Sequence, residues 1–251
     1  DSSAPADAPA APDTPETHRY GETVTVASSP QVDGYDFYWH ADGVELQNGS
    51  FEMPGEDVVL TGTFIRRTDT PYTVVYYANK IGSDTEYEVL STESMTGTTG
   101  AEAVATVRTL TGMTWDEAAT ASMGRASGVI TGDGSLTLSL YYKRDTYHVN
   151  YKLEGAAGAG TEVPGGTEGY VHTYGETVKI QPDLPDDEDQ NLSFDGWSVK
   201  TVSVRNNSFT MPAFDVVIVG SYTQYSGIRY KVEHYLESET PGVYETAPAK
   251  T

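Results

Sequence analysis

An internal repeat constrains the fold of this chain more than any other feature of its sequence. The stretch NGSFEMPGEDVVLTGTF at 48–64 returns as NNSFTMPAFDVVIVGSY at 206–222, and HRYGETVTV at 18–26 returns as HTYGETVKI at 172–180. Such self-similarity is typical of arrays in which each repeat builds the same small supersecondary unit. The copies differ by one residue between a Phe and a Trp and by three in the preceding loop, and we expect such insertions to fall in turns.

A second pattern alternates with the first. YTVVYY at 72–77 returns as YKVEHY at 230–235, so the unit of repetition is a pair of segments of two kinds, A and B. The predicted segments are A1 (1–66), an A-type repeat without its first strand, in which 1–17 is a Pro/Ala-rich loop or linker; B1 (67–144), a complete B-type repeat; A2 (145–225), a complete A-type repeat; and B2 (226–251), the opening hairpin of a truncated B-type repeat.

Segment A1 differs from A2 at its start. A2 opens with the strand-like run TYHVNYKLE at 146–154, whereas HRYGETV in A1 follows a Pro-rich stretch that resembles only the loop after that strand. Unpaired sheet edges recruit strands from other chains. We therefore expect the open edge of A1 to accept a strand from elsewhere, with RYKVEHYLE at 229–237 of a neighbouring molecule as the candidate.

Alternating apolar residues predict the strands of the A-type segments. In DVVLTGTF at 57–64, every second residue is apolar or Gly, which is the period of a strand. A Gly at the same place in both copies, Gly62 and Gly220, predicts a bulge or a close backbone approach. The preceding SFEMP and SFTMP predict a strand that ends at a Pro-governed turn. The expected core anchors are Trp39, Phe51 and Met53 in A1, and Trp197, Phe209 and Met211 in A2.

Segment B1 is also predicted to be mainly β. Its strands are expected at 72–78, 85–92, 102–109 and 134–142. TWDEAATAS at 114–122 predicts a short helix, with Thr114 as N-cap and a Glu at the third helical position. The junctions between segments span only a few residues, so adjacent domains are expected to stack end to end as a stiff rod.

The composition excludes several classes of partner. A formal charge of -22 over 251 residues would repel a phosphate backbone, so no nucleic-acid partner is expected. Because the chain has no Cys, disulfides and thiolate metal sites are excluded. Membrane insertion of this segment is not expected, since no apolar run approaches the roughly 18 residues of a membrane span. Any export signal or anchor would lie outside the sequence.

No catalytic, metal or cofactor site is recognisable. The histidines lack HExxH spacing, and His18 and His172 hold equivalent strand-entry positions that favour a structural role. Ser127 lies outside a G-x-S-x-G elbow, and GAAGAG at 155–160 lacks the Lys of a phosphate-binding loop. PDDEDQN at 185–191 could bind Ca²⁺ through its carboxylates, but a solvated loop is favoured because the D-x-D-x-D-G order is absent.

The repeated motifs carry a family resemblance. YxVxYY, then TGTTG, then GVITGDGSLTLSLYYKR in B1 resemble MucBP-type (mucin-binding-protein) repeats of Gram-positive surface proteins. YGETVxI, FDGW, SFTMP and DVVIVGSY in A2 resemble the Listeria–Bacteroides or internalin B-repeat kind of β-grasp-like repeat. The resemblance implies a mainly β fold with minor α+β character: small β-grasp-like domains in a tandem array, end to end, with at most one short helix per unit. It also implies an extracellular protein that is secreted or anchored to the cell wall.

Two functions of different kinds are compatible with these features. The first is a non-catalytic stalk or spacer in a bacterial cell-surface adhesin, with no cofactor, whose repeats project a distal binding region. The alternative is a module that binds host mucin or glycoprotein glycans, because tyrosine rings have apolar faces that can stack on sugars. The candidate contact residues for the second function are Tyr76, Tyr77, Tyr141 and Tyr142.

Overall fold

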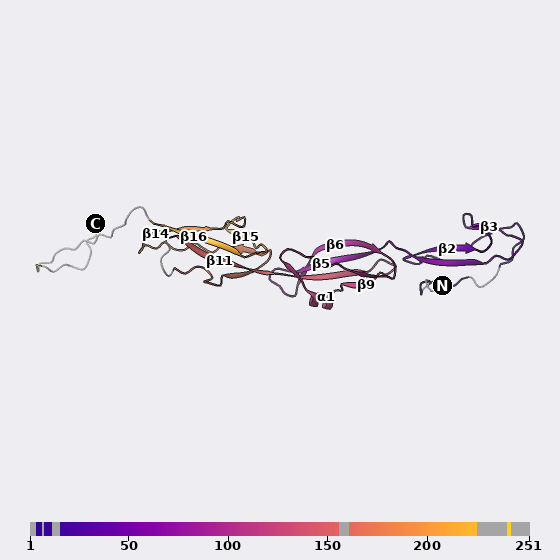
Figure 1. Ribbon diagram of the computed structural model, residues 1–251, viewed down its shortest axis with the longest axis horizontal. Helices are drawn as coiled ribbons and strands as arrows, with labels where there is room; N and C mark the ends of the chain where they lie inside the picture. Colours follow the sequence, from indigo (N-terminus) through magenta and orange to yellow (C-terminus); the bar gives the residue numbers. More distant parts are fainter. Residues whose placement is uncertain (1–3, 7, 12–15, 156–160, 225–239, 242–251) are drawn as a thin grey trace. The chain divides into compact units, whose positions relative to one another are not determined.

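The computed structural model describes residues 4–6, 8–11, 16–155, 161–224 and 240–241. The chain divides into two compact units, Asp1–Asp145 and Thr146–Thr251. In the described ranges strands dominate and one short helix is present (Figure 1), which confirms the mainly β prediction. The opening hairpin predicted for B2 lies outside the described residues.

Segment A2 forms a four-stranded sheet with a parallel pair at its centre. The strand order is β12-β11-β16-β14, in which β11 and β16 run parallel and both outer pairs are antiparallel. A separate antiparallel ladder joins β13 to β15. The strands are β11 (Thr146–Gly155), β12 (Tyr170–Thr173), β13 (Thr177–Lys179), β14 (Leu192–Ser198), β15 (Ser208–Thr210) and β16 (Val216–Gln224). The opening strand of the segment therefore pairs with its last strand.

The core of A2 forms on one face of this parallel pair. Val149 and Tyr151 of β11 lie opposite Val216 and Ile218 of β16, and all four are at most 4% exposed. They share a face because residues two apart along a strand point the same way. The rest of the cluster comes from Val178, Ile180, Phe209 and Met211, with Trp197 packed against it and partly buried. The expected anchors Phe209 and Met211 are therefore buried in the core.

The described residues of segment A1 form two ladders that correspond to the β13–β15 and β14–β16 ladders of A2. Strand β1 pairs antiparallel with β3, and β2 pairs antiparallel with β4. The bounds are β1 (Thr23–Thr25), β2 (Tyr35–Ala41), β3 (Ser50–Glu52) and β4 (Leu60–Arg66). Of the expected anchors, Phe51 is buried, while Trp39 and Met53 are half-buried. The repeated strand–turn–strand stretch therefore contributes one strand to each of two ladders. Its first strand, β3, pairs with β1, and its second, β4, pairs with β2.

The extra residue in FDGW of A2 forms a β-bulge within strand β14. The β14–β16 register shifts between Phe194 and Trp197, whereas the β2–β4 register of A1 is regular. As a result, Trp197 lies opposite Gly220 in A2, just as Trp39 lies opposite Gly62 in A1. The expectation that insertions fall only in turns is wrong here, because a bulge can absorb one residue inside a strand without moving its neighbours to the other face.

The repeated Gly lies directly beneath two aromatic rings. A Cβ on Gly220 would come within 2.7 Å of the rings of both Phe194 and Trp197. Gly62 has the same surroundings, because a Cβ there would lie 3.2 Å from the Trp39 ring and closer still to a Phe ring. The close approach predicted for this position is confirmed, and only Gly leaves room for the rings to cover the backbone.

Segment B1 repeats the strand order of A2. Its sheet has the order β6-β5-β10-β8, with β5 and β10 as the central parallel pair, and β7 forms a separate ladder with β9. The bounds are β5 (Thr70–Asn79), β6 (Tyr87–Gly97), β7 (Glu102–Val104), β8 (Met113–Trp115), α1 (Glu117–Met123), β9 (Ser127–Val129) and β10 (Thr137–Arg144). In both segments the first and last strands thus meet at the centre of the sheet.

Two local predictions for B1 are corrected. Strand β7 ends at Val104 rather than near 109, because the chain then leaves the β7–β9 ladder and crosses the core. The helix begins after Asp116, whose carboxylate accepts a hydrogen bond from the backbone N–H of Ala119. Thr114 is not the N-cap, because it belongs to β8 and pairs with Lys143 of β10. Tertiary pairing with β10 outweighs the local capping signal.

Backbone contacts join A1 to B1 within the first unit. The Arg67 N–H donates to the Gly34 carbonyl, and the Thr99 N–H donates to the Arg67 carbonyl, both at 2.9 Å. Beneath them the buried hydroxyls of Thr70 and Thr99 lie 2.6 Å apart. A Cβ on Gly132 would collide with the backbone before Gly34. The junction therefore consists of close backbone packing rather than a loose linker.

Substituting Gly220 tests the aromatic cover over β16. We expect Gly220→Ala to lower the free energy of unfolding of the second unit by about 1–3 kcal/mol, because both rings must move to admit a methyl group. Urea unfolding followed by tryptophan fluorescence measures the change. Gly55→Ala is the control, since a Cβ there meets nothing within 4 Å. An unchanged unfolding transition of the second unit in Gly220→Ala would contradict this account of the glycine.

Candidate functional site

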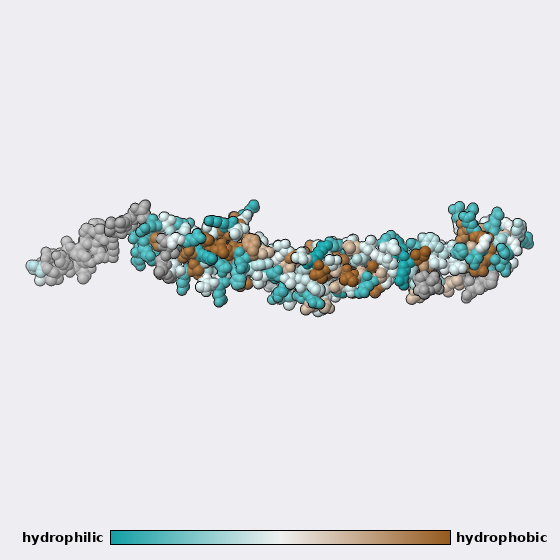
Figure 2. All heavy atoms as spheres, viewed as in Figure 1, coloured by the Kyte–Doolittle hydropathy of each residue, from teal (hydrophilic) through white to brown (hydrophobic). Residues whose placement is uncertain are grey.

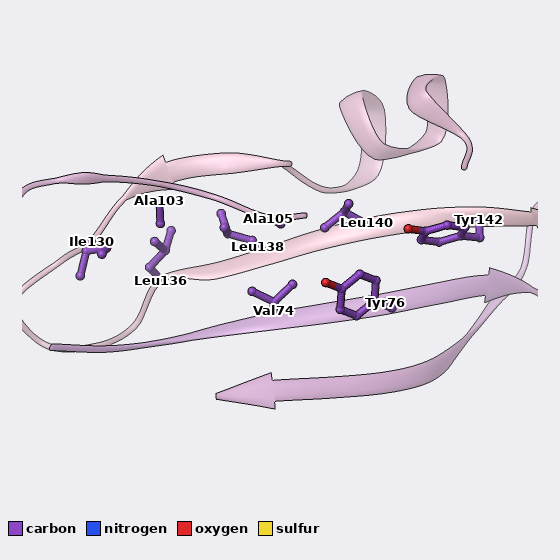
Figure 3. Close-up of a cluster of buried hydrophobic side chains, with 9 residues drawn as sticks. All are labelled: Val74, Tyr76, Ala103, Ala105, Ile130, Leu136, Leu138, Leu140 and Tyr142. Atoms are coloured by element: carbon purple, nitrogen blue, oxygen red, sulfur yellow. The ribbon is translucent and has the colours of Figure 1, made fainter. Parts of the chain in front are cut away.

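The four tyrosines proposed as glycan contacts lie on opposite faces of the B1 sheet. Tyr76 and Tyr142 point into the core and are 2% and 0% exposed (Figure 3). Tyr77 and Tyr141 are adjacent in sequence to these residues, so they lie on the other face and are half-buried. The proposal of exposed contacts is therefore wrong for Tyr76 and Tyr142, because both side chains are buried.

The two buried tyrosines hold the segment that follows β7. The Tyr142 hydroxyl accepts a hydrogen bond from the Arg108 N–H at 2.8 Å, and the Tyr76 hydroxyl donates to the Thr106 carbonyl at 3.2 Å. Burial raises the pKa of the Tyr76 hydroxyl, which keeps it a neutral donor at ordinary pH. Both hydroxyls satisfy backbone groups that would otherwise be buried without partners. Their role is structural.

The remaining candidate surface is a cluster that we call the tyrosine cluster, made of Tyr77, Tyr87 and Tyr141. The Tyr77 and Tyr141 rings stack with centroids 4.7 Å apart and planes 9° apart, and Tyr87 meets Tyr141 edge-on at 4.9 Å. Burial raises the pKa of both Tyr87 and Tyr141. Sequence reasoning missed Tyr87, since it lies on a different strand and only the β5–β6 pairing places it beside the others.

A crevice on the same segment carries a charged pair that sequence reasoning also missed. The Arg108 guanidinium lies 4.3 Å from the centre of the Tyr76 ring and pairs with the Glu93 carboxylate. The crevice has a volume of about 260 Å³, and Val104 and Met95 form part of its wall. Because Arg108 is engaged by both a carboxylate and a ring, the pair clamps β6 to the segment after β7.

The histidines predicted to be structural form part of a repeated turn. In A2 the His172 Nδ1 lies 2.9 Å from Glu176 Oε1, while Glu176 Oε2 accepts from the Thr173 N–H. Burial raises the pKa of Glu176, but the hydrogen bonds from His172 and Thr173 outweigh it, so the pKa is lowered. In A1 the equivalent His18 Nδ1 lies 3.3 Å from Glu22 Oε1. In both copies the histidine braces the turn into the next strand.

The acidic loop considered as a Ca²⁺ site uses two of its carboxylates to hold its own backbone. Asp186 Oδ1 accepts from the Phe194 N–H at 2.9 Å and from the Ser193 hydroxyl at 3.1 Å. Asp187 accepts from the backbone and side-chain N–H groups of Gln190 at 3.0 and 2.9 Å. Across the described residues, no three His, Cys, Asp or Glu side chains converge in a way that could hold a metal ion.

A known family matches more than half of the chain. The family described as divergent InlB B-repeat domain matches residues 4–68 and 151–226. These ranges cover the two A-type segments, and B1 lies between them. No curated protein matches the sequence. Within the described part of the chain, the seven-residue α1 falls well short of a membrane-spanning length and no other helix is present.

The turn around His18 predicts a pH dependence. Hydrogen bonds to Glu22 and Glu16 raise the pKa of His18 above its ordinary value of 6.5. The resulting stabilisation is fully present below the unfolded-state pKa and is lost as the pH rises through the folded-state pKa. We therefore expect the stability of the first unit to fall between roughly pH 6 and 8 in the native chain and to change less in His18→Asn. Thermal unfolding across this range measures the difference.

His40→Asn is the control for this experiment, because the His40 side chain is 74% exposed. It should keep the pH dependence of the native chain. If His18→Asn and His40→Asn show the same pH dependence of stability, protonation of His18 does not stabilise the turn.

Proposed function

Because the chain belongs to the divergent InlB B-repeat family, a repeat domain of bacterial surface proteins, we propose that it serves as a non-catalytic stalk. The stalk would be part of a cell-surface adhesin of a Gram-positive bacterium and would project a distal binding region. It would lie outside the cell, secreted or anchored to the cell wall. The observation that carries the proposal is the same strand order in A2 and B1, which makes the segments variants of one building block.

The building block fits a β-grasp-like domain. In A2 and in B1 the first and last strands form a central parallel pair, and each is flanked by an antiparallel partner. A short helix in B1 lies beside the edge of β10, where Asp116 N–H donates to the Tyr141 carbonyl. We therefore extend the proposal to a tandem array of four segments, bounded at 66, 144 and 225. B1 and B2 would be its MucBP-like members.

The A1–B1 junction supports a mechanical role. A stalk transmits force or holds distance only if its domains have little freedom relative to each other. At this junction the carbonyls of Gly34 and Arg67 accept backbone hydrogen bonds, and the buried hydroxyls of Thr70 and Thr99 meet. Breaking these contacts while the groups stay buried would leave polar groups without hydrogen-bond partners, which is costly. We propose that the other junctions, which are equally short in the sequence, restrict the domains similarly.

The acidic composition suits the same setting. A formal charge of -22 keeps neighbouring copies apart by mutual repulsion. This property helps a protein that is displayed densely on a surface.

Binding of host mucin or glycoprotein glycans is a second candidate, favoured by the tyrosine cluster. Tyr77 and Tyr141 are half-buried rather than buried, and their rings stack on each other. A half-buried tyrosine ring can use its exposed part to pack against the apolar face of a sugar. Tyr76 and Tyr142 are not part of this candidate surface.

Distance measurements across the A1–B1 junction test the stalk. The chain has no Cys, so spin labels on Glu45→Cys and Asp84→Cys are unique. We expect a narrow distribution of distances in the native chain and a clearly broader one in Gly132→Val, because a side chain there collides with the Asp33 carbonyl. Pulsed electron paramagnetic resonance gives both distributions. Gly55→Val is the control, and a broad distribution in the native chain would contradict a stiff stalk.

Glycan binding is tested separately with a mucin-glycan array probed by the full chain. If the tyrosine cluster binds sugars, Tyr77→Ser combined with Tyr141→Ser should reduce binding by roughly tenfold or more, as expected for loss of two stacking contacts. Tyr38→Ser is the control, since Tyr38 is 56% exposed and lies outside the cluster. Absence of binding by the native chain at millimolar glycan would remove the second candidate.

A further inference from the structure

The crevice of B1 lies beside one edge of strand β7. This strand forms a two-stranded ladder with β9, and among the described residues no other strand pairs with it. The Ala105 N–H, just after β7, donates to the Ala126 carbonyl at 2.8 Å. Because backbone groups alternate in direction along an antiparallel strand, Glu102 and Val104 direct theirs away from β9. This edge of β7 can therefore exchange hydrogen bonds with a further strand.

The crevice has a largely apolar floor of limited size. Tyr72, Val74 and Tyr76 line it and stand two residues apart along β5, so they share the face of the sheet that bears the core. On β6, Met95 lies opposite Tyr72, and Glu93 lies opposite Val74. The volume of about 260 Å³ lies below the roughly 300–1,000 Å³ of a typical small-molecule pocket. The crevice therefore suits one or two side chains from a neighbouring strand.

Apolar side chains around the crevice are exposed to water. Val104 is 67% exposed, Val129 is 57% exposed and Met95 is 43% exposed. In Figure 2 hydrophobic residues reach the surface of B1 between β6 and β9. Ala103 and Ala105, in contrast, belong to the buried core cluster (Figure 3). Covering the exposed apolar side chains is favourable, because it removes their surface from water.

The charges around the crevice favour a cationic partner. Among the described residues that line it, the cation is Arg108, which is already paired with Glu93. Glu102 of β7 is exposed and forms no ion pair with any described residue. A strand with Lys or Arg opposite Glu102 would gain a cross-strand ion pair. A second copy of this chain is a poor occupant, because its formal charge of -22 makes two copies repel each other.

We propose that the edge of β7 and the crevice bind an extended, cationic segment of another protein as an added strand. The backbone of this segment pairs with the outward-facing groups of Glu102 and Val104. Its apolar side chains enter the crevice over Tyr72 and Val74, while Lys or Arg side chains on its other face lie beside Glu102. Alternation of apolar and basic residues is therefore the pattern recognised. Such binding does not depend on the stalk role, because a single B-type segment carries both the edge and the crevice.

Titration of the full chain with labelled peptides tests the pattern. The probe is a short peptide in which Lys and Val alternate, and the control has the same composition in scrambled order. Both peptides carry the same charge, so general attraction to an acidic protein affects them equally. We expect fluorescence anisotropy to show roughly tenfold tighter binding of the alternating peptide, because only this peptide places all its apolar residues on one face. Equal binding of the two peptides, or no binding of the alternating one, would overturn the proposal.

Proline substitutions test the strand edge. Val104→Pro removes an N–H that points away from β9, and we expect it to weaken binding of the alternating peptide by roughly tenfold or more. Val129→Pro is the matched control, because Val129 is similarly exposed in the same ladder and directs its backbone groups away from β7. Proline is tolerated at strand edges, so both variants should keep the native circular dichroism spectrum. Equal losses of binding in the two variants would overturn the proposal.

Met95→Glu tests the crevice independently of the proline variants. The added negative charge would strengthen a purely electrostatic attraction to the Lys–Val peptide, whereas an apolar crevice predicts binding weaker by roughly tenfold. Met95 is 43% exposed, so the new carboxylate can reach water and the fold should persist. Unchanged or tighter binding would overturn the proposal. So would sedimentation that shows self-association of the native chain and its loss in Val104→Pro, since a second copy would then occupy the edge.

Discussion

The parallel pairing of the first and last strands organises each complete segment. In A2 it brings Val149 and Tyr151 against Val216 and Ile218, and in B1 it brings β5 against β10 in the same way. These two strands are distant in sequence, so the pairing closes the whole segment into one core. The flanking antiparallel strands pair with the outer edges of this central parallel pair, and the small second ladder forms separately from the sheet.

Tyrosine hydroxyls and aromatic rings hold the irregular parts of each segment to this pair. Tyr142 in B1 accepts from the Arg108 N–H, and Tyr151 in A2 accepts from the Gln181 N–H. Each hydroxyl satisfies a backbone group in a segment that crosses the core outside any ladder. A protein without disulfides can thus keep small domains rigid through packing and buried hydrogen bonds. That property suits the stalk role that we propose.

Sequence patterns located the strands well and the candidate site poorly. Alternation in DVVLTGTF and its copy identified β4 and β16, and the recurrence of Gly62 and Gly220 indicated a close approach whose cause, two overlying rings, appears only in the structure. The glycan proposal failed for Tyr76 because adjacent tyrosines on a strand point to opposite faces, and composition does not tell which face is inside. The Arg108–Glu93 pair lay beyond prediction, since its members come together only through strand pairing.

The sequence by itself determined that one small β unit recurs, where its strands lie and which residues alternate toward a core, because these properties depend on local periodicity and on comparison between copies. Only the tertiary structure decided which strands pair. That pairing placed the helix start at Asp116 instead of Thr114 and turned the extra residue before Trp197 into a bulge. Contacts between strands far apart in sequence outweigh local signals, because pairing and burying a strand stabilises the fold by more free energy than a single cap or turn does.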